Sequence, residues 1–228
     1  MKHDFKLSPI WWAVLPLSFF IVSSGMELFA DDTLLEGLLI ENGAVEILQT
    51  IIIALAFITT AFTLPVAIRT KNNFLIGWTL CATIGCFYIT GEEISWGQHI
   101  FFWSTPENWM VLNDHHETNI HNTTSWLDQK PRTLLEIGIL AGNIIIPLWQ
   151  KIGAAEWLSR FEIILPPVNL WLVATALWIT KLSKDLAGLF DINLIRTSEL
   201  NEVYIYYFIL IYMIVFRKRL AALKTSSS

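Results

Sequence analysis

Charged side chains and cysteines are both scarce in this sequence. Charged residues make up 15% of the chain and hydrophobic residues 54%, with a mean hydropathy of +0.52, whereas about 25% of residues are charged in ordinary soluble domains. Because so much apolar surface needs lipid to cover it, the composition excludes an ordinary soluble domain and predicts an integral membrane protein. The two cysteines, Cys81 and Cys86, are too far apart on one helix for a disulfide, so a disulfide framework is also excluded.

Clustered basic residues are nearly missing as well. The formal net charge is -5, and the longest run of Lys and Arg is 217–219, directly after the last apolar stretch. Proteins hold a phosphate backbone with clustered Lys and Arg, so we expect no nucleic-acid partner. The run itself is typical of a cytoplasmic anchor beside a membrane span.

Long apolar stretches are what the sequence does contain. Each is close to the roughly 20 residues that a helix needs to cross the bilayer, which predicts an all-α, polytopic membrane helix bundle with about six transmembrane helices. We expect a single domain over 1–223 and a polar tail at 224–228. The predicted spans are 10–29, 44–68, 74–91, 133–150, 161–183 and 202–218.

Two of these stretches allow a second interpretation. The stretch at 133–150 contains Glu136, Asn143 and Pro147, which also fits a re-entrant or broken helix. The stretch at 10–29 follows a basic start, as in a secretory signal peptide. Because no A-x-A-like cleavage site follows it, we expect a retained helix.

Lysine and arginine predict the orientation of the bundle. With both termini on the cytoplasmic side, ten of the fifteen Lys and Arg residues face the cytoplasm, the side that they favour in membrane proteins. Seventeen of the twenty Asp and Glu residues then lie at or near the outer side, where a long loop covers about 92–132. We expect a multi-pass protein of the bacterial inner (cytoplasmic) membrane, with interfacial helices on its outer face.

The outer loop begins with the string GEEISWGQH at 91–99. If the preceding helix continues through this string, one helical face carries Glu92, Ser95, Trp96 and His99. An ionisable side chain at the edge of a membrane span is costly and therefore suggests a functional site. The alternative is an interfacial turn whose acids simply face water.

A second group of polar residues lies at 113–122, where three of the five histidines and two acids fall within ten residues. Glu117 and His121 are one turn apart on a helix, a spacing at which a carboxylate and an imidazole can bind one metal ion. The pattern is not the HExxH of zinc peptidases, because His116 and His121 are one position too far apart. A solvated polar loop is the alternative.

Acidic pairs also precede two of the predicted spans. The pairs are Glu41 with Glu46 and Glu199 with Glu202. If these helix starts meet beside the outer loop, the carboxylates repel one another unless a bound cation, or Arg132 and Arg196, compensates their charge. Alternatively, the acids only complement the dipoles of the helices that they begin.

Several strings in these segments resemble a family of uncharacterised bacterial multi-pass membrane proteins. The family carries a GEEISWGQ-type motif followed by TPE and ExNxHN elements, which match 91–98, 105–107 and 117–122 here, and ENGAVE at 41–46 fits as well. The resemblance is close in the outer-face segments, whereas the apolar helices resemble those of the family only in their general apolar character. It implies a multi-pass membrane protein and supplies no activity.

The leading functional hypothesis is a metal-dependent hydrolase or transferase that acts on a lipid or lipid-linked substrate at the outer leaflet. Glu92 and Glu93 would be its catalytic carboxylates. Zn, Mn or Fe would suit the mixed ligand set, because Mg prefers oxygen ligands. The expected metal ligands are Glu117, His121, Glu92 and His99, and the expected supporting residues are Glu46, Ser95, Gln98, Asn119, Glu199 and Glu202.

Two alternatives stay open. A small cation- or proton-handling transporter would use the same acids as an outer vestibule and would need ionisable groups inside the bilayer, for which Glu27 and Glu136 are the candidates. A non-catalytic subunit would instead dock a membrane-protein partner, or form a homo-oligomer, through the aromatic side chains of the outer loop.

Overall fold

The computed structural model describes residues 7–39, 43–110, 118–120, 123, 125–153, 156–190 and 197–225. Across these ranges every regular element is a helix, as the sequence predicts. The long helices are α1 (Leu15–Phe29), α3 (Ala44–Arg69), α4 (Asn73–Glu93), α7 (Ser125–Leu140), α9 (Trp171–Leu189) and α10 (Thr197–Thr225). The short helical elements are η1 (Ile10–Val14), α2 (Asp32–Leu39), η2 (Ser95–Gly97), α5 (Gln98–Phe101), α6 (Glu107–Met110), η4 (Ala141–Ile145), α8 (Ile146–Lys151), η5 (Glu156–Phe161) and η6 (Val168–Leu170).

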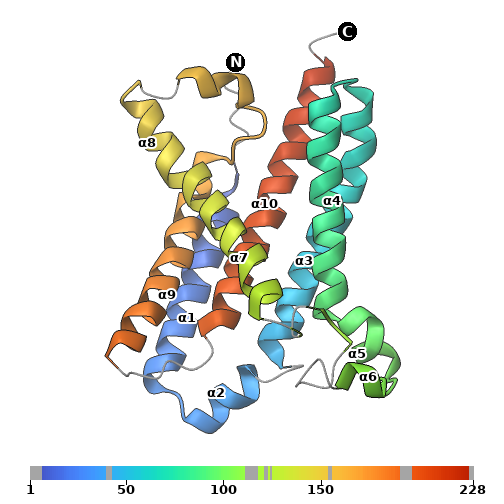
Figure 1. Ribbon diagram of the computed structural model, residues 1–228. Coiled ribbons are helices and arrows are strands. Elements are labelled where there is room, and N and C mark those ends of the chain that lie inside the picture. The colour runs from blue at the N-terminus through green and yellow to red at the C-terminus, as the bar shows by residue number, and fades with distance from the viewer. Residues whose placement is uncertain are drawn as a thin grey trace.

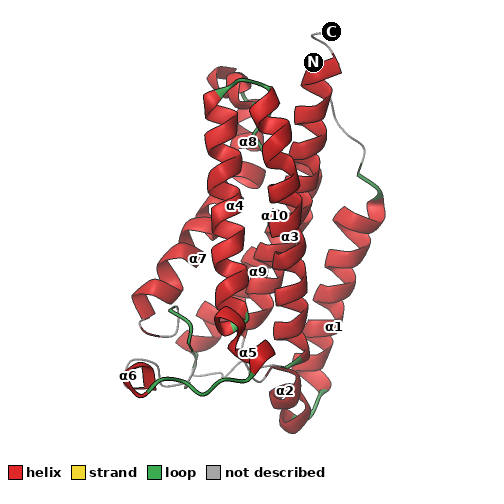
Figure 2. Ribbon diagram, turned by 90° about the vertical axis from the view of Figure 1, so that its right-hand side faces the viewer, coloured by secondary structure: helices red, strands yellow, loops and turns green. Residues whose placement is uncertain are grey.

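Five helical stretches in the described part of the chain are long and apolar enough to cross a membrane. They are Ile10–Phe29, Ala44–Arg69, Asn73–Glu93, Lys130–Lys151 and Glu199–Leu223. Figures 1 and 2 show the long helices side by side, with α2, α5 and α6 gathered at one end of the bundle, here called the loop end. In Figure 1, α1 runs toward the loop end and α10 ends far from it.

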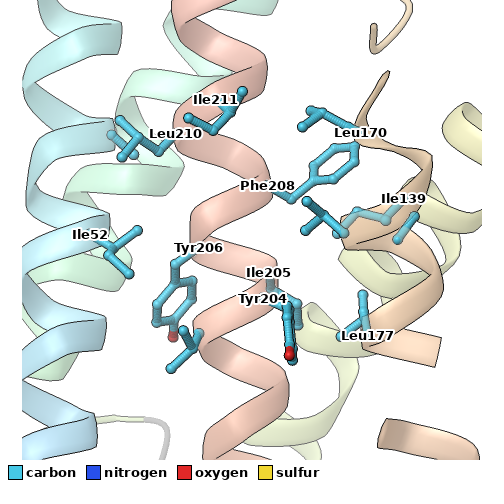
Figure 3. Packing of buried hydrophobic residues seen from close by; sticks show 14 of the residues in the cluster. Ile52, Ile139, Leu170, Leu177, Tyr204, Ile205, Tyr206, Phe208, Leu210 and Ile211 are labelled. Carbon is cyan, nitrogen blue, oxygen red and sulfur yellow. The ribbon is translucent and has the colours of Figure 1, made fainter. Parts of the chain in front are cut away.

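Helix α10 forms the centre of the bundle. It packs against α3 and α9, and α3 packs in turn against α4. Successive side chains of α10, such as Tyr204, Ile205 and Tyr206, are all buried, whereas α1 has one buried residue and lies at the edge. Figure 3 shows Ile52 of α3 and Leu177 of α9 on opposite sides of α10. Because 67% of its apolar window is buried, the highest share among the five apolar stretches, α10 is mostly enclosed by protein.

Helices α3 and α4 form an antiparallel hairpin that reverses at 70–72. The Asn72 side chain caps α4, because its Oδ1 accepts hydrogen bonds from two backbone N–H groups at 3.0 and 3.3 Å. The hairpin carries the end of α4, with Glu92 and Glu93, back to the loop end.

The predicted span at 161–183 is not a single helix, which corrects the boundary expected from hydropathy. Pro166 and Pro167 interrupt it, because proline lacks an N–H and disfavours helical geometry in the residue before it. Helix α9 begins only at Trp171 and ends at Leu189. Helix α9 contains charged residues and is therefore not one of the five apolar stretches named above. It nevertheless packs alongside α1 and α10.

The predicted span at 133–150 forms one continuous stretch of α7, η4 and α8 rather than a broken helix. Its middle segment, η4, is a π-helix, which widens the helix locally without ending it. Gly142 lets the loop before α9 approach η4 closely, because a Cβ at Gly142 would lie 2.7 Å from Cγ of Pro166. The sequence therefore located this helix correctly and missed its π-helical turn.

Candidate functional site

Helix α4 ends at Glu93, and the chain then reverses at the loop end. Ser95 and Trp96 have positive φ values of 45° and 54°, a region that residues other than glycine rarely adopt. These two residues end the helical path. The continuous helical face that the sequence predicts from Glu92 to His99 therefore does not form.

Trp96 folds back over the last turns of α4. Its ring meets those of Phe87 and Tyr88 edge-on, with centroids 6.0 and 6.1 Å away, and its indole N–H donates to Glu92 Oε1 at 2.5 Å. Gly91 makes room for the ring, because a Cβ at this position would lie 2.8 Å from Cζ3 of Trp96. The Gly, the first Glu and the Trp of the motif therefore form one packed unit.

Glu92 is 3% exposed, and both of its carboxylate oxygens accept hydrogen bonds. While Oε1 accepts from Trp96, Oε2 accepts from the backbone N–H of Ile120 at 2.7 Å. Charge-assisted bonds of this kind are roughly twice as strong as neutral ones. Glu92 thus fixes the far part of the outer loop to α4, and its role as a catalytic group or metal ligand stays a prediction.

Gln98 and Ser95 hold the same loop through further hydrogen bonds. Gln98 Nε2 donates to Thr105 Oγ1 at 2.8 Å, and Gln98 Oε1 accepts from the Thr118 N–H at 2.7 Å. Thr118 Oγ1 donates to the Ser95 carbonyl oxygen at 2.8 Å, and Asn119 Nδ2 donates to the Ser95 hydroxyl at 3.3 Å. These contacts connect all three motif strings. The loop anchor is defined as Glu92, Ser95, Gln98, Thr105, Thr118 and Asn119.

Glu93 belongs to a different group, directed toward α10. Its Oε1 accepts a hydrogen bond from the hydroxyl of Tyr206, a buried residue, at 2.7 Å. One turn earlier on α10, Glu202 forms an ion pair with Arg132 of α7, with 2.5 Å between Nη1 and Oε1. This pair agrees with the expectation that Arg132 compensates the acids at the start of the last span.

Gln49 connects α3 to the same group. Its fully buried side chain donates from Nε2 to the carbonyl oxygen and to Oε2 of Glu199, at 2.7 and 3.2 Å. These two donations fix the orientation of the amide. The other amide atom, Oε1, has no hydrogen-bond partner in the described part of the chain. The loop-end polar cluster is defined as Gln49, Glu93, Arg132, Glu199, Glu202 and Tyr206.

The loop-end polar cluster gathers like charges in a poorly solvated place. Glu93 and Glu199 both repel the Glu202 carboxylate, while Arg132 attracts it. Such repulsion is screened less between helices than in water. Because the cluster holds three carboxylates and one guanidinium, its chemistry favours a ligand that donates hydrogen bonds or carries positive charge.

The predicted metal site is only partly within the described residues. Glu117 and His121 lie outside them, as does the side chain of His99. In the part of the chain that the structure describes, no group of three or more His, Cys, Asp and Glu side chains is placed to hold a metal ion. The metal site therefore stays a prediction.

The predicted supporting residues divide between the two groups. Glu46 lies in the first turn of α3, one turn before Gln49, where its charge favours the helix dipole. Ser95, Gln98 and Asn119 belong to the loop anchor, and Glu199 and Glu202 to the loop-end polar cluster.

Sequence reasoning missed Gln49 and Tyr206. Each had a signal, because Gln49 is a polar residue inside an apolar stretch, three positions after Glu46, and Tyr206 follows Glu202 by one helical turn. Spacing alone could not show that both side chains face the acids of other helices.

The two groups at the loop end differ in chemistry. The loop anchor bonds one segment of chain to another, whereas the loop-end polar cluster keeps a buried acceptor on Gln49 that no other described residue satisfies. No family model, curated protein or solved structure matches this chain, so its function is inferred from this geometry.

Proposed function

We propose that this protein binds a small monovalent cation at the loop-end polar cluster and moves it across the bacterial inner membrane. The loop end would face the extracytoplasmic side and both termini the cytoplasm, in keeping with the distribution of Lys and Arg. Helix α9 would be a sixth crossing beside the five apolar stretches. Its 19 residues and its contacts with α1 and α10 support that placement.

The observation that carries this proposal is the side chain of Gln49. Its Oε1 is a buried acceptor with no partner among the described residues, and a buried unsatisfied polar atom costs about 1–3 kcal/mol. Rotating the Gln49 amide to exchange its oxygen and nitrogen would lose hydrogen bonds, because Nε2 already donates twice to Glu199. The neighbouring carboxylates are acceptors too, so a cation or another hydrogen-bond donor would satisfy them together and an anion would be repelled.

A monovalent cation fits this cluster better than a divalent metal. Divalent metals in proteins take several carboxylate or imidazole ligands at short distance, and the described residues offer no such group. Arg132 also supplies one positive charge within the cluster. Carboxylates between membrane helices commonly mark ion pathways.

The test uses the full-length protein in detergent and in liposomes. Binding of Na⁺, K⁺ and ammonium is measured by calorimetry, and uptake of these cations and of protons is measured under an imposed gradient. Glu202→Gln removes one charge, and Gln49→Leu removes the buried acceptor. Losing a hydrogen bond to a charged group costs about 1.5–3 kcal/mol, so we expect roughly ten- to hundredfold weaker binding in each variant. Glu107→Gln, an exposed acid at the loop end, is the matched control and should bind as the wild type does.

Size-exclusion chromatography and thermal unfolding establish that each variant is folded. Equal cation binding and equal uptake of cations and protons by wild type, Glu202→Gln and Gln49→Leu would contradict the proposal. The same conclusion would follow if the wild type bound none of the three cations and transported neither them nor protons.

A second candidate function, the metal-dependent hydrolase or transferase acting on lipid, is favoured by the loop anchor. Residues 118–120 are bonded to Glu92, Ser95 and Gln98, beside the end of an apolar helix. This tripeptide lies between Glu117 and His121 in the sequence. Elemental analysis of the purified protein tests the idea: Zn, Mn or Fe at near one equivalent, lost in His121→Ala and Glu117→Gln but kept in Glu107→Gln, would support it. No bound metal after incubation with these ions would exclude it.

A further inference from the structure

A second ionic site lies within the helices. Glu136 of α7 is 2% exposed and forms an ion pair with the Lys181 ammonium of α9. The same ammonium lies over the ring of Trp178, 5.8 Å from its centroid. Glu136 is part of the apolar stretch Lys130–Lys151. Because ion pairs are costly in such surroundings and mark ion or proton pathways more often than they add stability, this pair calls for a functional explanation.

Arg132 connects this pair to the loop-end polar cluster. It precedes Glu136 by four residues on α7, so the two side chains lie on one helical face. Arg132 itself pairs with Glu202 of α10. The charged groups near Glu136 are therefore Lys181 from α9, Arg132 from its own helix and, beyond Arg132, Glu202 from α10.

Polar atoms continue on the other side of the ion pair. Asn143 lies seven residues, or about two turns, after Glu136 in the π-helix η4, which contacts α9. Its Nδ2 donates to the carbonyl oxygen of Pro167 at 3.0 Å, while its Oδ1 has no partner within the described ranges. The buried indole N–H of Trp178 on α9 also has no partner among those residues.

A buried acceptor on η4 and a buried donor on α9 thus lie beyond the ion pair, on the side away from the loop end. Short π-helical turns inside α-helices are frequent at functional sites. Polar groups are therefore spaced along α7 and α9 from Arg132 and Glu202, through Glu136 and Lys181, to Asn143, and water between them would complete a path.

We propose that the transported cation is a proton and that Glu136 and Lys181 form its binding site between the two sides of the membrane. This inference rests on the proposed function and names its substrate. The loop-end polar cluster collects the cation, and the ion pair passes it between α7 and α9.

The transfer balances in three steps. An incoming proton forms an O–H bond on the Glu136 carboxylate, which removes the counter-charge of Lys181. The Lys181 ammonium, now uncompensated and with its side chain only 27% exposed, loses one N–H proton to water on the far side. The neutral Glu136 acid then gives its proton to the neutral Lys181 amine, so one proton has crossed and the ion pair has re-formed.

The experiment measures proton flux with the full-length protein in liposomes. A pH-sensitive dye is enclosed, and a potassium diffusion potential drives proton entry. We expect flux in the wild type and its loss to the level of empty liposomes in Glu136→Gln and in Lys181→Met. The double variant Glu136→Gln with Lys181→Gln removes both charges and leaves no buried ion unpaired, which protects the fold while removing the site. Lys184→Gln and Asp185→Asn, exposed residues of the same helix, are the controls and should keep the flux.

The outcomes separate the two proposals. Proton flux at the wild-type level in the folded double variant would overturn the inference and leave the ion pair a structural bond. Transport of Na⁺, K⁺ or ammonium without proton flux would overturn it too, while the proposed function survives. Loss of proton flux in a folded Glu136→Gln variant, with the flux kept in Lys184→Gln and Asp185→Asn, would support it. If the wild type neither binds nor transports any cation, the proposed function fails and the inference with it.

Discussion

Gly91 and Trp96 show how single residues determine the form of the loop end. The Trp96 ring occupies the space that a side chain at position 91 would fill, because a Cβ there would lie only 2.8 Å from the ring. Overpacking of this kind costs about 1–3 kcal/mol. We therefore expect Gly91→Ala to lower the free energy of unfolding by that amount, measured by denaturant unfolding in detergent and followed by tryptophan fluorescence.

Gly85 is the matched control for this prediction. It lies on the same helix and has nothing within 4 Å of its added Cβ. Because alanine favours a helix over glycine, Gly85→Ala should leave stability unchanged or raise it slightly. A Gly91→Ala protein as stable as Gly85→Ala would show that Trp96 does not pack over α4 as described.

The bond between Tyr206 and Glu93 is a second prediction at the level of residues. Tyr206→Phe removes the hydroxyl that donates to Glu93 and leaves the ring in place. Losing the donor should cost about 1–3 kcal/mol of unfolding free energy, because Glu93 loses a partner in a poorly solvated place.

A double-mutant cycle with Glu93→Gln isolates the contact. Residues that touch directly couple by about 0.5–3 kcal/mol, so the double variant should be less destabilised than the sum of the single ones. Strict additivity would mean that the two side chains do not interact.

Helices α7 and α10 are joined by the ion pair of Arg132 and Glu202, whose side chains are 22% and 18% exposed. Arg132→Met would leave Glu202 near two other carboxylates without its cation. Removing one partner of a mostly buried pair costs up to about 3–5 kcal/mol, discounted here because both groups are partly solvated. Chemical denaturation in detergent should show a clear loss in Arg132→Met and partial recovery in Arg132→Met with Glu202→Leu. An equal loss of stability in the single and the double variant would argue that the ion pair does not hold α7 and α10 together.

Hydropathy predicts the apolar helices well because each is long enough for its composition to stand out. The error at 161–183 arises because averaging over a window hides the effect of Pro166 and Pro167 on the backbone. The reversal after α4 was missed for another reason. Ser95, one of its left-handed residues, is held by Thr118 and Asn119, which are 23 and 24 positions away, and contacts so distant in sequence leave no local pattern.

The candidate site was also predicted only in part. The sequence shows that Glu199 and Glu202 begin the last span, and the predicted topology places Arg132 at the same side of the membrane. It does not show that Gln49, 150 positions away from Glu199, completes the cluster. Convergence of side chains from α3, α4, α7 and α10 depends on how the whole bundle packs, which local spacing does not determine.

The number of crossings is the prediction for the whole molecule. If α9 crosses the bilayer, Ile152 before it and Phe190 after it lie on opposite sides. Both are exposed, at 76% and 73%, so a cysteine at either position can react. In Figure 1, α9 ends near the loop end and begins near the opposite one. We expect Phe190→Cys to react with a membrane-impermeant maleimide in intact spheroplasts and Ile152→Cys to react only after permeabilisation.

The background for this experiment needs Cys81→Ala and Cys86→Ala, since both native thiols are free. Glu107→Cys at the loop end and Lys71→Cys at the turn between α3 and α4 are reference positions for the two sides. Labelling of positions 152 and 190 from the same side would place α9 on one surface and the termini on opposite sides. The six-crossing arrangement would then be wrong. The path proposed along α7 and α9 would also fail to cross the membrane, because α9 would not span it.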